Sequence, residues 1–125
     1  TTPPEERIAL RWFKNQSVDF QGNISMKGKT PIVMKRFNNL GDISEGRRLE
    51  SNGVPFSLLD YGVAAVIGFS TDNALIGGGN NFHIRVYTEV KNNEWYVNGD
   101  WRSINSKEGW MVTIMFIRTE MSKWI

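Results

Sequence analysis

The chain contains a single histidine, His83, and no cysteine, which limits the nucleophilic and metal chemistry open to it. A Ser-His-Asp triad would have to use His83. Its expected neighbour across the strand is Arg102, and a cationic neighbour makes a poor setting for a general base. An imidazole metal site needs a second histidine or a carboxylate cluster, and there is no His-x-His or His-x-x-x-His spacing. The sequence therefore predicts no catalytic residue of this kind, no metal site and no cofactor.

Two carboxylates, Glu89 and Asp100, fall on one face of a predicted β-hairpin. A glycosidase needs two carboxyl groups about 5–10 Å apart, but Tyr96 and Arg85 are expected to face these side chains across the strands. The triple glycine at 77–79 precedes neither a helix signal nor a lysine, so it does not match a phosphate-binding loop. We expect a protein that is not an enzyme, with a polysaccharide-cleaving domain as an alternative.

Aromatic and polar side chains share this hairpin face. Flat rings stack on the apolar side of a sugar, while amide, carboxylate and guanidinium groups hydrogen-bond its hydroxyls. A receptor-binding surface is therefore predicted at Arg85, Tyr87, Tyr96, Asn98, Asp100 and Arg102. The alternative interpretation is aromatic packing across the strands that only stabilises the sheet.

The element that positions these residues is an antiparallel hairpin predicted over residues 82–104. Asn92 and Asn93 are placed at the turn, because asparagine tolerates the positive φ that both central positions of a type I′ turn require. Setting Lys91 opposite Glu94 then fixes the register, and a slip of one residue would mix the two faces. On the apolar face, the predicted cross-strand pairs are Val90 with Trp95, Thr88 with Val97, Val86 with Gly99 and Ile84 with Trp101. On the polar face, they are Lys91 with Glu94, Glu89 with Tyr96, Tyr87 with Asn98, Arg85 with Asp100 and His83 with Arg102.

Short apolar runs separated by glycine, asparagine and serine predict an all-β fold for the rest of the chain. The uniformly apolar run 63–69 is expected to be a strand covered on both faces. Residues 38–55 show no period and predict a surface loop, or an edge with a short strand or helical turn. This segment is either functional or simply a long connection. Loops 38–55 and 70–81 are expected to extend the binding surface. Further strands are expected at 7–13, 18–20, 24–26, 31–37 and 110–118.

The last of these strands, 110–118, is apolar on both sides. Antiparallel sheets usually keep one face in contact with water. Because a domain this small has little with which to cover a second apolar face, we predict that the strand lies near a subunit contact. The predicted interface residues are Met111, Thr113, Met115 and Ile117. The apolar tail, 119–125, is expected to pack against the domain or a neighbour.

Composition excludes several classes of partner. The chain has 125 residues, enough for one domain with one core, and a formal net charge of +2. Its basic residues are scattered, so nucleic acid is not expected as a partner. No apolar run approaches the about 18 residues of a membrane span, and no signal peptide is visible, so membrane insertion is not expected.

Two stretches of the chain resemble bacteriophage tail fibres and spikes. Residues 8–37 look like their shaft-to-tip passage, in which a short strand and turn precede a hydrophobic-Asp-hydrophobic triplet, Gly-Asn, a strand and a glycine. The closing part is similar to the C-terminal knob of some enterobacterial phage fibres. The His-x-His repeats that bind metal at some fibre tips are missing, which excludes that type of tip. The matching segments are Val18-Asp19-Phe20, Gly22-Asn23, Ile24-Ser25-Met26, Gly28, Trp95–Trp101 and Glu108–Val112.

The resemblance implies an antiparallel sandwich or jelly-roll-like knob over 31–125, homotrimeric, after a short β-rich, shaft-like lead-in over 1–30. It implies a receptor-binding tip of a tail fibre or related virion appendage. The expected partner is a bacterial surface receptor, either lipopolysaccharide or an outer-membrane protein. The alternatives are a structural cap that trimerises or penetrates the envelope without a specific receptor, the polysaccharide-cleaving domain, and a eukaryotic trimeric jelly roll of the cytokine or complement type.

Overall fold

The computed structural model describes residues 10–12, 18–20, 22, 24–25, 27–71, 83–102 and 109–125. Within this part the protein is all-β, and every strand pairing is antiparallel. The chain divides into two compact units, Thr1–Pro31 and Ile32–Ile125. No helix among the described residues is long and apolar enough to cross a membrane.

The first unit contains a two-stranded sheet of β1 (Leu10–Trp12) and β2 (Val18–Phe20). The predicted strand 18–20 is confirmed, as is the described part of the predicted strand 7–13. The predicted strand 24–26 is wrong where it can be compared, because Ile24 and Ser25 are not in a strand. Ile24 is half exposed, and a turn with positive φ at Lys27 and Gly28 follows at once. Without apolar cover, so short a run has nothing to hold it extended.

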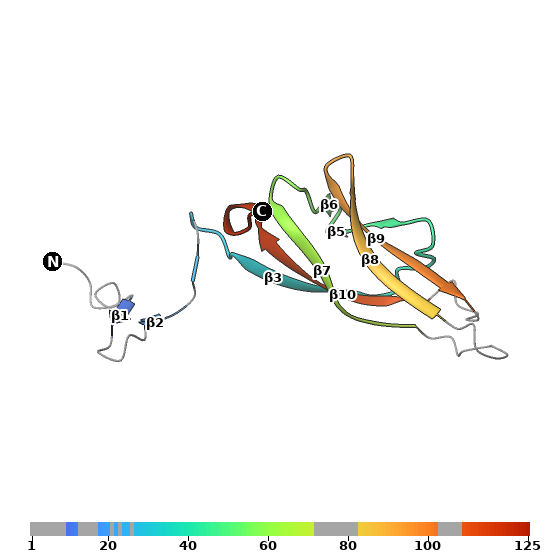
Figure 1. Cartoon of the computed structure of the whole chain (residues 1–125), viewed down its shortest axis with the longest axis horizontal. Coiled ribbons are helices and arrows are strands. Elements are labelled where there is room, and N and C mark those ends of the chain that lie inside the picture. Colours follow the sequence, from blue (N-terminus) through green and yellow to red (C-terminus); the bar gives the residue numbers. More distant parts are fainter. Residues whose placement is uncertain are drawn as a thin grey trace. The chain divides into compact units, whose positions relative to one another are not determined.

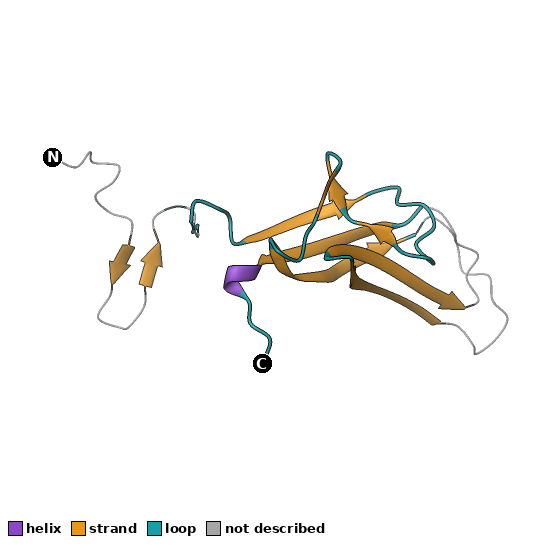
Figure 2. Cartoon of the chain, turned by 90° about the horizontal axis from the view of Figure 1, so that it is seen from above, coloured by secondary structure: helices purple, strands orange, loops and turns teal. Residues whose placement is uncertain are grey.

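The second unit contains two three-stranded sheets (Figure 1). The first has the order β3 (Ile32–Phe37), β10 (Met111–Arg118), β7 (Tyr61–Ser70), and the second has the order β4 (Arg47–Arg48), β9 (Glu94–Arg102), β8 (His83–Lys91). A small hairpin of β5 (Glu50–Ser51) and β6 (Val54–Pro55) separates β4 from β7 along the chain. The 3-10 helix η2 (Thr119–Met121) directly follows β10, as Figure 2 shows.

The two sheets share one hydrophobic core. The predicted strand 110–118 is confirmed as β10, whose Val112, Ile114 and Phe116 are completely buried. Val97 of β9 is also fully buried and belongs to the same cluster. A hydrogen bond from the Trp95 indole Nε1 to the Tyr61 carbonyl oxygen, 2.8 Å long, ties the second sheet to the first.

The predicted hairpin is confirmed in every described pair. The register runs without a shift from His83 opposite Arg102 to Lys91 opposite Glu94. Asn92 and Asn93 have φ values of 53° and 61°, as a type I′ turn requires. The apolar face, with Trp95 and Val97, points into the core. Local turn chemistry and a strict two-residue period were therefore enough to fix this element.

The prediction that 63–69 is covered on both faces is wrong. These residues lie in β7, which is an edge strand, and the centre of the sheet is β10. Gly62 and Ala64 are buried, but the other face of β7 is only partly covered, and Ile67 at a register shift is exposed. The small residues serve a different purpose: Thr88 of β8 approaches closely enough for its hydroxyl to donate to the Ala64 carbonyl oxygen. A run of small apolar residues can therefore indicate that a neighbouring strand approaches closely, rather than that both faces of the strand are buried.

The predicted strand 31–37 is confirmed with its start at Ile32. For residues 38–55, the alternative of an edge with a short strand is confirmed, because β4 lies at the edge of the second sheet. The segment is not only a surface loop, since it carries three short strands and fully buries Ile43 and Leu49.

The tail 119–125 contacts the domain at its start, where the Thr119 N–H and hydroxyl donate to the Asp60 and Leu58 carbonyl oxygens at 3.0 Å and 2.9 Å. Its apolar side chains do not pack there, since Met121 and Ile125 are exposed and Trp124 is 84% exposed.

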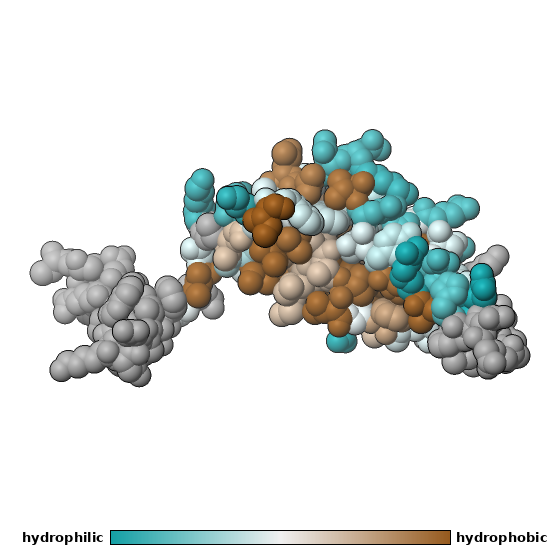
Figure 3. Space-filling view, viewed as in Figure 1, coloured by the Kyte–Doolittle hydropathy of each residue, from teal (hydrophilic) through white to brown (hydrophobic). Residues whose placement is uncertain are grey.

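One face of the first sheet is apolar yet points away from the core. Met115 of β10 lies between Met34 of β3 and Ala65 of β7, and Ile117 lies between Ile32 and Val63. Figure 3 shows hydrophobic residues gathered over β3, β7 and β10. We call this surface the outer apolar face; it consists of Ile32, Met34, Val63, Ala65, Met115 and Ile117. The four predicted interface residues, Met111, Thr113, Met115 and Ile117, are on this side of β10 and are partly exposed.

Candidate functional site

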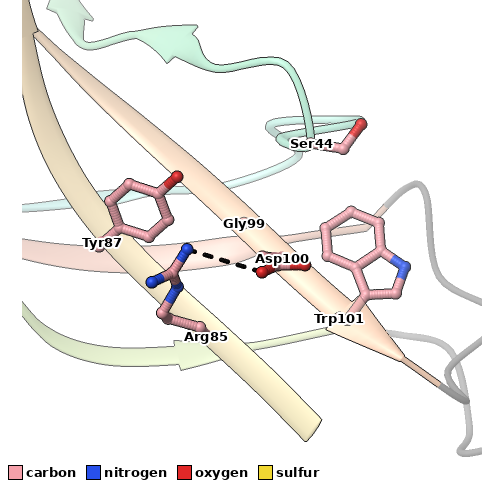
Figure 4. Close-up of a pocket in the computed structure, with 6 residues that line it drawn as sticks. All are labelled: Ser44, Arg85, Tyr87, Gly99, Asp100 and Trp101. Carbon is pink, nitrogen blue, oxygen red and sulfur yellow. Dashed lines mark ion pairs between the residues drawn. The ribbon is translucent and has the colours of Figure 1, made fainter.

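A pocket of about 390 Å³ opens beside the polar face of the β8–β9 hairpin. Three of the predicted binding residues, Arg85, Tyr87 and Asp100, contribute to it (Figure 4). Arg85 and Tyr87 come from β8, and Asp100 comes from β9. Its full lining is Ser44, Arg85, Tyr87, Gly99, Asp100 and Trp101.

The polar groups of this pocket contact each other only loosely. The Arg85 Nη2 atom lies 3.6 Å from Oδ2 of Asp100, its partner across the strands. The same guanidinium lies 4.6 Å from the centre of the Tyr87 ring, a cation-π distance. The side chains of Arg85 and Asp100 are 64% and 53% exposed, and exposed ion pairs of this kind hold their partners weakly. Both groups are therefore available to a ligand.

His83 has a second neighbour besides the one that the predicted register gives it. The cross-strand partner of His83 is Arg102, as predicted. However, its Nε2 atom lies 3.5 Å from Oδ1 of Asp100, the diagonal neighbour. Diagonal pairs in a twisted sheet also come within reach of long side chains. Figure 4 shows the Ser44 side chain pointing away from Asp100, so the pocket does not present a serine nucleophile to this pair.

The other half of the polar face is closed by its own side chains. The Lys91 Nζ atom lies 3.0 Å from Oε1 of Glu89 and 5.3 Å from the centre of the Tyr96 ring. Asn98 is only 5% exposed, which contradicts its predicted outward position. Gly46 covers it so closely that a Cβ at position 46 would lie 2.8 Å from the Asn98 Oδ1 atom. Tyr96 and Asn98 thus stand apart from the pocket, and Lys91 and Gly46 occupy the space around them.

The predicted register places Lys91 opposite Glu94 correctly, but the charged groups of the two residues pair with other side chains. Although the two residues lie opposite each other, Lys91 pairs with Glu89 on its own strand. Glu94 pairs instead with Arg48 of β4, at 3.4 Å, and Arg48 also contacts Glu50 at 2.8 Å. Strand β4 brings a second cation to this edge of β9, and the pairing of β4 with β9 was not predicted.

The pair of Glu89 and Lys91 predicts a dependence of stability on pH. The Lys91 ammonium, which hydrogen-bonds the carboxylate, lowers the pKa of Glu89, and the Asn98 amide acts in the same direction. A lowered pKa in the folded state means that ionised Glu89 stabilises the fold at neutral pH. This stabilisation is lost as the pH falls below about 4.3, the pKa of an unperturbed glutamate, and through the lower folded value.

We therefore expect the wild-type protein to be more stable than Glu89→Gln at pH 7. The difference should shrink in urea unfolding experiments at successively lower pH. Glu120→Gln, at an exposed position in η2, is the matched control and should show no such trend. A stability gap between wild type and Glu89→Gln that stays constant through acid pH would contradict the assignment.

Arg102 lies at the end of β9, is exposed and does not line the pocket. Ser44 comes from the loop 38–55 that was expected to extend the binding surface, whereas Gly99 and Trp101 were not predicted as site residues. Gly99 did carry a signal, because a glycine inside a strand often marks close approach of another segment. Its N–H donates to the Ile43 carbonyl oxygen at 2.9 Å, and a Cβ there would lie 2.7 Å from the Ile43 side chain.

The segment 42–46 forms the wall of the pocket along the edge of β9. The Ser44 N–H donates to Oδ1 of Asp42 at 2.8 Å, which makes a tight local turn. Gly46 closes the turn onto the Ile43 carbonyl oxygen. Of the second loop expected to take part in binding, 70–81, residues 72–81 lie outside the described part of the chain.

The described residues contain no group of three or more His, Asp or Glu side chains arranged to hold a metal ion. In comparisons with known proteins, no family model, no curated protein and no solved structure matches this chain.

Proposed function

We propose that the chain is the receptor-binding tip of a bacteriophage tail fibre or related virion appendage. It attaches through the pocket to a surface glycan of a bacterium. The observation that carries the proposal is the convergence of Arg85, Tyr87 and Asp100 on one exposed pocket. A guanidinium, an aromatic ring and a carboxylate in such a pocket supply both the apolar and the hydrogen-bonding contacts that a sugar needs.

The proposed architecture follows from the two sheets and their shared core. We take Ile32–Ile125 to be a sandwich or jelly-roll-like knob that assembles as a homotrimer. The outer apolar face supports this assembly, because Met34 is 68% exposed and continues an apolar surface across three strands. A contiguous apolar patch on a soluble domain marks an interaction site. A trimer would also present three pockets to one cell surface.

The test is attachment of the fluorescently labelled full chain to a panel of enterobacterial strains and to immobilised lipopolysaccharide from the strains that bind. Arg85→Ala is expected to weaken attachment by about tenfold or more, since it removes charge-assisted hydrogen bonds. Arg47→Ala is the matched control, because Arg47 is exposed on β4 and does not line the pocket. It should attach like the wild type.

Two results would contradict the proposal. One is the absence of attachment to any strain together with an unchanged host range when this segment is exchanged between fibres, which would favour a structural cap. The other is attachment to cells but not to lipopolysaccharide, with Arg85→Ala unaffected, which would favour a protein receptor contacted elsewhere.

A further inference from the structure

The charges in the pocket nearly cancel. Arg85 is its one cationic lining residue, and Asp100 carries the opposite charge at its centre. The Nε2 atom of His83 lies 3.5 Å from Oδ1 of Asp100. An acidic sugar would meet the Asp100 carboxylate at close range, and this repulsion offsets its attraction to Arg85. The electrostatics therefore give a carboxylated or phosphorylated ligand no net advantage over a neutral one.

The hydrogen-bonding capacity of the pocket suits hydroxyl groups. The two oxygens of Asp100 lie 3.5 Å and 3.6 Å from nitrogen atoms of His83 and Arg85, which is longer than the about 2.7–2.9 Å of a charge-assisted hydrogen bond. An ionised carboxylate only accepts hydrogen bonds, so its two oxygens match two neighbouring hydroxyl donors. Arg85 supplies donors for the oxygens of the same hydroxyls. Two adjacent hydroxyls can thus be bound by both side chains at once.

The walls of the pocket are aromatic. Figure 4 shows Tyr87 and Trp101 on opposite sides of Asp100. The Trp101 ring packs 5.2 Å from the ring of buried Trp110, which fixes its position. Gly99 also lines the pocket, and the space where its side chain would lie is taken by Ile43 and Trp101. A volume of about 390 Å³ is large enough for a saccharide ring.

The geometry points to a neutral sugar as the ligand, recognised through two adjacent hydroxyl groups by Asp100 and Arg85. This inference rests on the proposed function and names its ligand class. Asp100 sets the specificity: its charge accepts hydrogen bonds from hydroxyl donors and offsets the attraction of Arg85 for acidic sugars. Removing that charge has opposite effects on the two kinds of sugar.

The experiment titrates the full chain with the methyl glycosides of glucose, galactose and mannose and with those of glucuronic and galacturonic acid. Binding is followed by the amide shifts of Ser44, Arg85, Gly99 and Asp100 in nitrogen-15 NMR spectra. At least one neutral glycoside is expected to bind, and its 2-deoxy or 4-deoxy analogue to bind more weakly. Asp100→Asn should weaken the neutral sugar by about tenfold and strengthen the uronic acids.

Asp60→Asn is the control, because Asp60 is exposed and does not line the pocket. It should leave both affinities unchanged. Asp100 is itself more than half exposed, and the dispersion of the amide spectrum verifies that the variant is folded; Arg85→Gln provides a second variant, which should weaken neutral sugars.

The inference is overturned if no neutral glycoside binds, if the uronic acids bind more tightly to the wild type, or if Asp100→Asn weakens both kinds of sugar equally. These failures are separable from failure of the proposed function. A domain that attaches to cells and loses attachment in Arg85→Ala, yet prefers uronic acids, refutes only the ligand class. A domain that attaches to no strain refutes the function, whatever the glycosides do.

Discussion

Replacing Phe116 with alanine is expected to lower the free energy of unfolding by about 3–5 kcal/mol, the range for a large aromatic side chain removed from a packed core. Phe116 is completely buried. Its ring stacks on Phe56 at a centroid distance of 4.0 Å with an interplanar angle of 8°, and the rings of Tyr61 and Phe37 lie at 5.4 Å and 6.3 Å. Truncation therefore leaves a cavity that three other rings cannot fill without moving.

Urea unfolding followed by tryptophan fluorescence measures this loss. Phe69→Ala is the matched control, because Phe69 is an aromatic residue of the edge strand β7 and is 43% exposed. Its loss should be less than half that of Phe116→Ala. If both variants lost the same free energy of unfolding, the prediction that the buried ring of Phe116 contributes more than the exposed ring of Phe69 would be contradicted.

Replacing Met34 with glutamate is expected to dissociate the proposed trimer and to weaken attachment to cells by about 10²–10⁴-fold. Met34 lies directly opposite Met115 on the outer apolar face, and it is so exposed within one domain that the substitution leaves the core intact. In a subunit interface, however, the new carboxylate would be buried without a partner, at a high cost. The loss of attachment follows because linked binding sites exceed single-site affinity by about that factor.

Sedimentation velocity reports the assembly, and the cell-attachment assay reports its consequence. Affinity for a monovalent glycoside should not change, since Met34 does not line the pocket. Leu59→Glu serves as the control: Leu59 is apolar and 81% exposed but lies outside the outer apolar face. A wild-type chain that sediments as a monomer at all concentrations would contradict the trimer and the avidity together.

The hairpin could be predicted from sequence because its determinants are local. Asn92 and Asn93 select the turn, and the turn then sets each of the nine observed pairs. The run 110–118 indicated a strand, but both of its sides are apolar, so its period alone did not show that Val112, Ile114 and Phe116 face the core. Wherever one face is apolar and the period is two, the register and the buried face follow from the chain itself.

The composition of the site depended on contacts between distant segments and could not be predicted. The two-residue alternation along β9 places Asn98 on the face that points away from the core. However, Gly46, which is far away in the sequence, covers its side chain. Ser44 belongs to the pocket because the Gly99 amide binds the Ile43 carbonyl oxygen and fixes that segment beside β9. Nothing in the period of β9 indicates which loop will lie along its edge. The strand order of the first sheet, which makes β7 an edge, is undetermined by local pattern in the same way.

The uninterrupted register of β8 and β9 has a consequence for how recognition can diversify. Positions 85, 87 and 100 are held in place by backbone pairing with their neighbours, and residues 85 and 100 extend largely into solvent. New side chains at these positions change the chemistry of the pocket while the turn and the buried face keep the strands aligned. Gly46 and Gly99 are different, because a side chain at either would collide with its cover. Positions 85, 87 and 100 therefore tolerate substitution, whereas the two glycines do not. Ligand preference can change by substitution at these three positions without loss of the fold.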